Sequence, residues 1–165
     1  MPQLANYEGD GKTTITMLDK ELSKYILIES CNGRGFFLSN NSFAFGSIIL
    51  FPNVIFQWKV KTIEDINRDS LTLFKLLEPK LDLLVIGIGE PRAWSHAAMT
   101  RMRKEVKASG VNAEIMATRD AVATYNFMLD DYRVVAGAFL PTVSKGEETL
   151  LKLKRNPRVA SIDAS

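Results

Sequence analysis

Two almost continuous apolar runs constrain the fold of this chain more than any other feature of its sequence. Residues 81–87 (LDLLVIG) and 134–140 (VVAGAFL) are each the length of a strand, and two helical patterns separate them. A strand that carries apolar side chains on both faces must be covered from both sides, as at the centre of a parallel or mixed sheet packed between helices. The two runs therefore predict an α/β domain.

The first third of the chain has the period of strands. Four short apolar or alternating segments are separated by turn residues and predict a β-meander, at residues 25–29, 36–38, 43–51 and 55–60. Asn32-Gly33 lies between the first two segments. It predicts a type I′ hairpin turn, because both central positions of that turn need positive φ.

After residue 60 the sequence alternates between helical and strand patterns. Helices are predicted at residues 69–78, 92–109 (with Gly110 as the C-cap) and 119–129, and strands at 81–87, 111–116 and 134–140. We predict one three-layer α/β domain, in which the N-terminal β-meander leads into a mixed sheet covered by helices. The expected boundaries are a flexible N-terminal arm at 1–14, the domain at 15–142 and a basic C-terminal extension at 143–165.

The composition argues against several classes of protein. The chain has 165 residues, a formal net charge of +2, one cysteine and one histidine. A single cysteine cannot form an intramolecular disulfide or a multi-cysteine zinc site, and so small a net charge does not indicate a nucleic-acid partner. No apolar stretch approaches the ~20 residues of a membrane-spanning helix. We predict no metal site, no cofactor and no nucleic-acid partner.

A hydrolase would have to use Cys31 and His96. Their side chains would need to meet within hydrogen-bond reach, and a third group would have to orient the base. The sequence offers no such group near either residue. We therefore expect a structural thiol and a helical histidine, and no catalytic residue.

A glycine turn and one helix are the candidate cleft. Gly87-Ile88-Gly89 follows a buried strand and precedes a helix, where a dinucleotide site places its phosphate loop, but Arg92 stands where the third glycine would be. The helix carries polar residues whose side chains either bridge to the backbone of a neighbouring loop or line a cleft. The candidate cleft residues are Gly87, Gly89, Thr118, Thr124, Tyr125 and Asn126. A small-molecule or nucleotide-binding module that uses the Gly87–Gly89 turn is the alternative interpretation of this pattern.

Two further regions are candidate partner contacts. Arg34 lies in the predicted hairpin turn. The basic extension carries leucines among its cations, a pattern that suits an anionic membrane surface or an acidic protein partner. Its candidate contact residues are Leu150, Leu151, Lys152, Lys154 and Arg155.

Several segments together resemble one known family. They are Gly35-Phe36, Pro52 with Trp58, residues 84–89 (LVIGIG), 114–118 (EIMAT), Ala121, 123–126 (ATYN), 133–136 (RVVA) and Leu140-Pro141. Over residues 15–142 the chain resembles the mitochondrial complex I (NADH:ubiquinone oxidoreductase) assembly factor 3 family, which has small bacterial and archaeal relatives. Residues 74–79 (FKLLEP) point to its animal mitochondrial branch.

This resemblance implies a three-layer α/β fold and a non-catalytic chaperone or scaffold for early quinone-module intermediates of the complex I peripheral arm. It implies complex I assembly factor 4 and quinone-module subunits as partners. The implied location is the mitochondrial matrix, with peripheral attachment to the inner membrane. Ile88 departs from the family, which usually has threonine there. The expected targeting peptide is not seen, so we expect a mature or alternative form of the chain.

Overall fold

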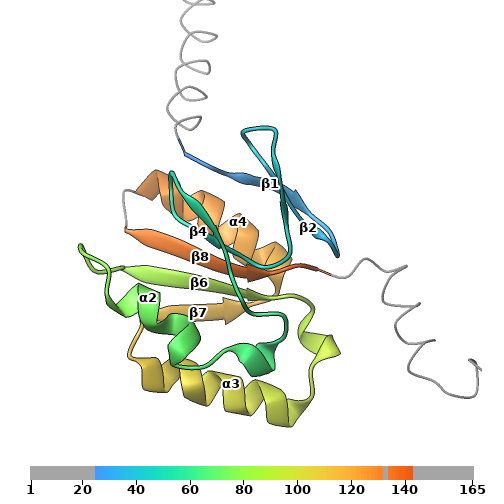
Figure 1. Ribbon diagram of the computed structural model, residues 1–165, viewed down its shortest axis with the longest axis vertical. Helices are drawn as coiled ribbons and strands as arrows, with labels where there is room; N and C mark the ends of the chain where they lie inside the picture. The colour runs from blue at the N-terminus through green and yellow to red at the C-terminus, as the bar shows by residue number, and fades with distance from the viewer. Residues whose placement is uncertain (1–24, 132–133, 143–165) are drawn as a thin grey trace, which may run out of the picture.

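The strands form two sheets in the computed structural model, which describes residues 25–131 and 134–142 (Figure 1). A three-stranded antiparallel sheet has the order β1-β2-β3, with β1 at Ile28–Cys31, β2 at Gly35–Leu38 and β3 at Phe43–Phe45. A five-stranded sheet has the order β5-β4-β8-β6-β7, with β4 at Ile48–Leu50, β5 at Ile55–Gln57, β6 at Leu83–Ile88, β7 at Ala113–Met116 and β8 at Val135–Leu140.

The five-stranded sheet is mixed, as predicted. Strand β6 runs parallel to both β7 and β8, whereas β4 runs antiparallel to β5 and β8. The last of the described strands, β8, therefore lies at the centre, between the β4–β5 hairpin and the β6–β7 unit. Both predicted apolar runs form the two central strands, β6 and β8, and every residue of each is buried.

Helices cover both faces of this sheet. The longer helices are α3 (His96–Ser109) and α4 (Thr118–Met128), and α2 (Thr72–Lys75) is a single turn. Four 3₁₀ turns complete the helical segments among the described residues, with η1 at Ile63–Asp65, η2 at Asp69–Leu71, η3 at Pro91–Ala93 and η4 at Leu129–Asp131. Figure 1 shows α4 beside β1 and β4, and α3 at the other end of the molecule, near β7.

The alternation of side chains along the central strands divides the core into two clusters. On β6, Leu84 and Ile86 pack with η1, η2, α2 and α3, whereas Leu83 and Val85 pack with α4 and the three-stranded sheet. Successive side chains of a strand point to opposite faces, so one continuous apolar run supplies both clusters. The fold is a three-layer α/β structure, as the sequence predicted.

The predicted strand at residues 43–51 is wrong as a single element. The chain breaks at Gly46, whose φ of 73° lies in the left-handed region that favours glycine, and β3 and β4 on either side join different sheets. The predicted meander is therefore divided: three strands form the smaller sheet, and β4 and β5 form one edge of the larger one.

Three smaller predictions also need correction. The hairpin between β1 and β2 forms, but Asn32 and Gly33 lack positive φ, and the Asn32 side chain instead accepts hydrogen bonds from the N–H groups of Arg34 and Gly35. The helix predicted at residues 92–109 begins, as α3, at residue 96, because the Ser95 hydroxyl caps it. The helix expected to reach residue 78 ends as α2 after one turn.

Candidate functional site

Thr118 joins the ends of both central strands to helix α4. Its hydroxyl accepts a hydrogen bond from the Gly89 N–H (2.7 Å) and donates one to the Leu140 carbonyl (2.6 Å), and its own N–H donates to the Gly89 carbonyl (3.0 Å). Thr118 and Gly87 are both buried. The structure thus brings the glycine turn and the start of α4 together, and Thr118 occupies the Gly89 amide that a phosphate would need.

Gly87 is where helix α4 comes closest to the sheet. A Cβ atom built on Gly87 would lie 2.9 Å from the Thr118 hydroxyl oxygen and 3.0 Å from the Thr118 Cα. Real Cβ atoms do not sit that close to backbone, so any larger residue would push α4 away from β6. At this point the glycine serves helix–sheet packing, and Thr118 fills the space beside it.

Asn126 bridges to backbone, one of the two roles expected of it. Its side-chain N–H donates to the Ile28 carbonyl (2.8 Å), and its carbonyl oxygen accepts from the Ile28 N–H (3.2 Å). One side chain on α4 thereby binds strand β1 as a neighbouring strand would. The Thr124 hydroxyl meets the Met116 sulfur at 3.4 Å.

Tyr125 lies wholly in the core beneath these residues. Its ring contacts the Phe139 ring edge-on, with centroids 5.8 Å apart. Burial raises the pKa of its hydroxyl above the ordinary value, and this oxygen has no hydrogen-bond partner among the residues that the structure describes.

The residues expected to make partner contacts are only partly described. Arg34 is exposed in the β1–β2 turn, and its carbonyl accepts from the Gly46 N–H. The remaining candidate contacts, Leu150, Leu151, Lys152, Lys154 and Arg155, lie outside the described residues.

Cys31 and His96 stand on different layers of the fold. Cys31 ends β1, packs against the cluster on the α4 side of the sheet, and accepts a contact from the Thr142 hydroxyl at 3.7 Å. His96 is exposed at the start of α3, which packs on the opposite face. Within residues 25–131 and 134–142, no group of three metal-ligating side chains gathers, and no helix has the length and apolar character needed to cross a bilayer.

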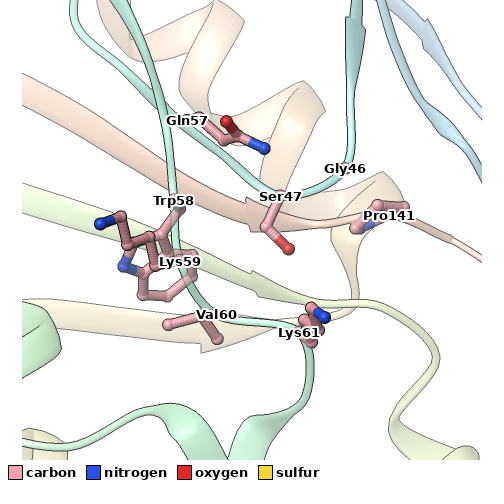
Figure 2. Close-up of a pocket in the computed structure, with 8 residues that line it drawn as sticks. All are labelled: Gly46, Ser47, Gln57, Trp58, Lys59, Val60, Lys61 and Pro141. Atoms are coloured by element: carbon pink, nitrogen blue, oxygen red, sulfur yellow. The ribbon is translucent and has the colours of Figure 1, made fainter.

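A hollow that the sequence did not predict opens at the carboxyl end of β8 (Figure 2). Its volume is about 470 Å³. One wall is the stretch at residues 57–61, and the other holds Gly46, Ser47 and Pro141. Along the first wall Gln57, Lys59 and Lys61 are exposed, whereas Trp58 and Val60 are buried. That alternation was visible in the sequence, but the opposite wall comes from distant segments that no local pattern connects.

The hollow is electropositive. Lys59 and Lys61 line it, and neither forms an ion pair with a described carboxylate. The nearby Asp65 carboxylate accepts hydrogen bonds from the backbone N–H groups of Lys61 (2.9 Å) and Thr62 (3.2 Å), which hold the pKa of Asp65 below its usual value. Asp65 is thus bound to backbone, and the Lys61 charge also attracts its carboxylate, although the two groups form no ion pair. Lys59 has no carboxylate partner in the described part of the chain.

Exposed aromatic rings lie on the strands β2, β3 and β5, next to the hollow that Lys59 and Lys61 line. Phe43 packs edge-on against both Phe37 and Phe45, with ring centroids 4.6 and 4.7 Å apart. Phe45 is 71% exposed and Phe56 is 48% exposed, and the two line a second hollow of about 310 Å³ that shares Gln57 with the first. Exposed apolar surface of this kind is typical of protein contact sites.

Known proteins similar to this chain agree on one family. A family model described as a protein of unknown function (DUF498/DUF598) matches residues 28–140. A Drosophila melanogaster protein named NADH dehydrogenase (ubiquinone) 1 alpha subcomplex assembly factor 3 is 39% identical over 90% of this chain and 76% of its own length. The Danio rerio protein of the same name is 37% identical over 79% of this chain and 72% of its own length.

A solved structure supports the fold independently. A Bordetella pertussis protein described as a Mth938-like domain superimposes with a TM-score of 0.53 and 20% identity, covering 74% of this chain and 90% of the other. At that identity the likeness concerns the fold alone. The same three-layer architecture is thus present in an experimental structure.

Proposed function

Because the chain belongs to the DUF498/DUF598 family, and within it to the family of complex I assembly factor 3, we propose that it is a non-catalytic assembly factor for mitochondrial respiratory complex I. The observation that carries this proposal is the 39% identity to a protein of that name over 90% of the chain. An assembly factor acts by covering surfaces of a subunit that still lacks its final neighbours, and it leaves when they arrive. That role needs a rigid domain with a surface that binds protein, and it needs no catalytic residues.

We place this role at early quinone-module intermediates of the peripheral arm, on the matrix side of the inner membrane. Complex I assembly factor 4 is the proposed direct partner, and attachment to the membrane is peripheral. The exposed aromatic edge at Phe45 and Phe56 supports contact with protein. Arg34 and the basic extension at residues 143–165 remain proposed contacts.

Affinity purification from mitochondria tests the proposal. Tagged protein is recovered, separated on native gels and analysed by mass spectrometry. We expect assembly factor 4 and quinone-module subunits to co-purify, and finished complex I to be absent. Recovery of the protein alone, without any complex I subunit, would contradict the proposed role. A variant lacking residues 145–165 tests the extension, which is not a contact if partner recovery is unchanged.

A further inference from the structure

We propose that the two hollows along β5, which share Gln57 in their lining, bind an extended acidic segment of a partner protein. An apolar side chain of that segment occupies the hollow at Phe45 and Phe56, and carboxylates farther along it pair with Lys59 and Lys61. This inference rests on the proposed function, because it gives the chemistry of the protein surface that an assembly factor would hold.

The charge of the first hollow selects the ligand. Lys59 and Lys61 lie two residues apart in a stretch where exposed and buried side chains alternate, so their stems leave the same side of the chain. Buried Trp58 and Val60 between them pack in the core and fix the stretch in place. Lys59 has no described acidic partner, and Lys61 has only the attraction of Asp65, whose carboxylate is already bound to backbone N–H groups. Two such neighbouring cations favour a ligand that carries carboxylates at similar spacing.

The wall opposite the lysines adds a donor. Ser47 is only 7% exposed, and its hydroxyl forms no hydrogen bond with another described residue. Figure 2 shows this hydroxyl on the side of Ser47 that faces Lys61 and Pro141. A nearly buried hydroxyl at the edge of a hollow that already holds two cations can donate to an entering carboxylate.

The shape favours a polypeptide over a small anion. Strand β5 is an edge of the five-stranded sheet, and the Trp58 N–H bonds inward to the Ser47 carbonyl (2.9 Å). Backbone groups of alternate residues point to opposite sides of a strand, so those of Lys59 face away from β4, and no described residue bonds to them. An edge with free backbone groups, an apolar hollow and a cationic hollow suits a segment of about six residues, since strands rise ~3.3 Å per residue.

The test uses the full-length protein and two fluorescein-labelled hexapeptides in fluorescence anisotropy. One peptide has an apolar first residue and two glutamates two positions apart, and the other has glutamines in their place. We expect the glutamate peptide to bind, and Lys59→Gln/Lys61→Gln to weaken it about fivefold or more, with the effect shrinking at high salt. The matched control is Lys104→Gln/Lys107→Gln, which removes two exposed charges from α3 and is expected to leave binding within about twofold.

Three results would overturn the inference. They are equal binding of the two peptides, equal losses in the two lysine pairs, and complete displacement of the peptide by free glutarate, which would make the hollow a small-anion site. Specific binding of the glutamate peptide supports the site whether or not complex I subunits co-purify with the chain. Failure of this inference and failure of the proposed function are therefore distinguishable.

Discussion

Among the described residues, Tyr125 is the one with a buried polar side-chain atom that has no hydrogen-bond partner. Its hydroxyl is enclosed by the core without a hydrogen-bond partner among the described residues, while its ring packs against Phe139. A buried hydroxyl without a partner costs free energy, because water can no longer satisfy it. The same burial raises its pKa above the ordinary 10.0, since the charged tyrosinate is disfavoured there.

Replacing this hydroxyl should stabilise the protein. For Tyr125→Phe we expect the free energy of unfolding to rise by about 1 kcal/mol near neutral pH, as measured by urea denaturation. The difference should widen above about pH 10, because the unfolded Tyr125 ionises there and the folded one does not, so the native protein loses stability as pH rises and the variant lacks that loss. A difference that stays constant from about pH 8 to 11 would contradict this account.

Sequence patterns identified the glycine turn and the polar residues of α4 as structurally important, but they did not predict which residues these would contact. Asn126 stood out because asparagine is a poor choice inside a helix. Asn126 proved to bind Ile28, which is 98 residues away along the chain. No local spacing encodes a bond of that range, since the tertiary fold alone brings the two residues together.

At the scale of elements, Asn126 holds strand β1 against helix α4. We expect Asn126→Ala to lower the free energy of unfolding by about 1–3 kcal/mol, because it leaves the N–H and C=O of Ile28 without these bonds. Hydrogen exchange followed by NMR should show faster exchange at the Ile28 amide. The control is Phe127→Ala, next on the same helix and 73% exposed, which we expect to change stability by no more than about 0.5 kcal/mol. Unchanged Ile28 exchange in Asn126→Ala would show that β1 is held by other contacts.

The two central strands followed their sequence patterns, whereas the predicted strand at residues 43–51 did not form as one element. The two apolar runs became the central strands because such strands have to be covered on both faces. The stretch at residues 43–51 has the composition of one strand, but Gly46 turns the chain from one sheet into the other. A glycine inside a strand pattern signals a bend, whereas the partner of each half depends on the whole sheet.

At the scale of the whole molecule, the exposed aromatic rings allow partner binding to be separated from stability. We expect Phe45→Ser/Phe56→Ser to reduce co-purification of complex I subunits severalfold. The variant should remain folded, because Phe45 is largely and Phe56 half exposed, and the lost Phe43–Phe45 and Phe51–Phe56 ring pairs are worth about 1 kcal/mol each. Thermal unfolding checks the second expectation, and native-gel mass spectrometry checks the first.

Leu76→Ser is the matched control for that variant. Leu76 is 74% exposed, lies directly after α2 and lines neither hollow, and its replacement should leave partner recovery unchanged. If both variants lose partners equally, general surface hydrophobicity, and not the edge at β3 and β5, would explain the binding. The sequence did not indicate these rings as contacts, because their positions depend on how the two sheets lie together.

The central place of β8 also gives this protein an order of events. A ribosome releases the β4–β5 hairpin and the β6–β7 unit first, and these two parts have no hydrogen-bonded neighbour in common until residues 135–140 emerge. Strand β8 then inserts between them. Until then β4 and β6 each expose an unpaired edge, and such edges can pair with other chains. We therefore expect the nascent chain to depend most on chaperones late in its synthesis. A protein whose proposed work is to shelter unfinished subunits would pass through the same exposed state itself.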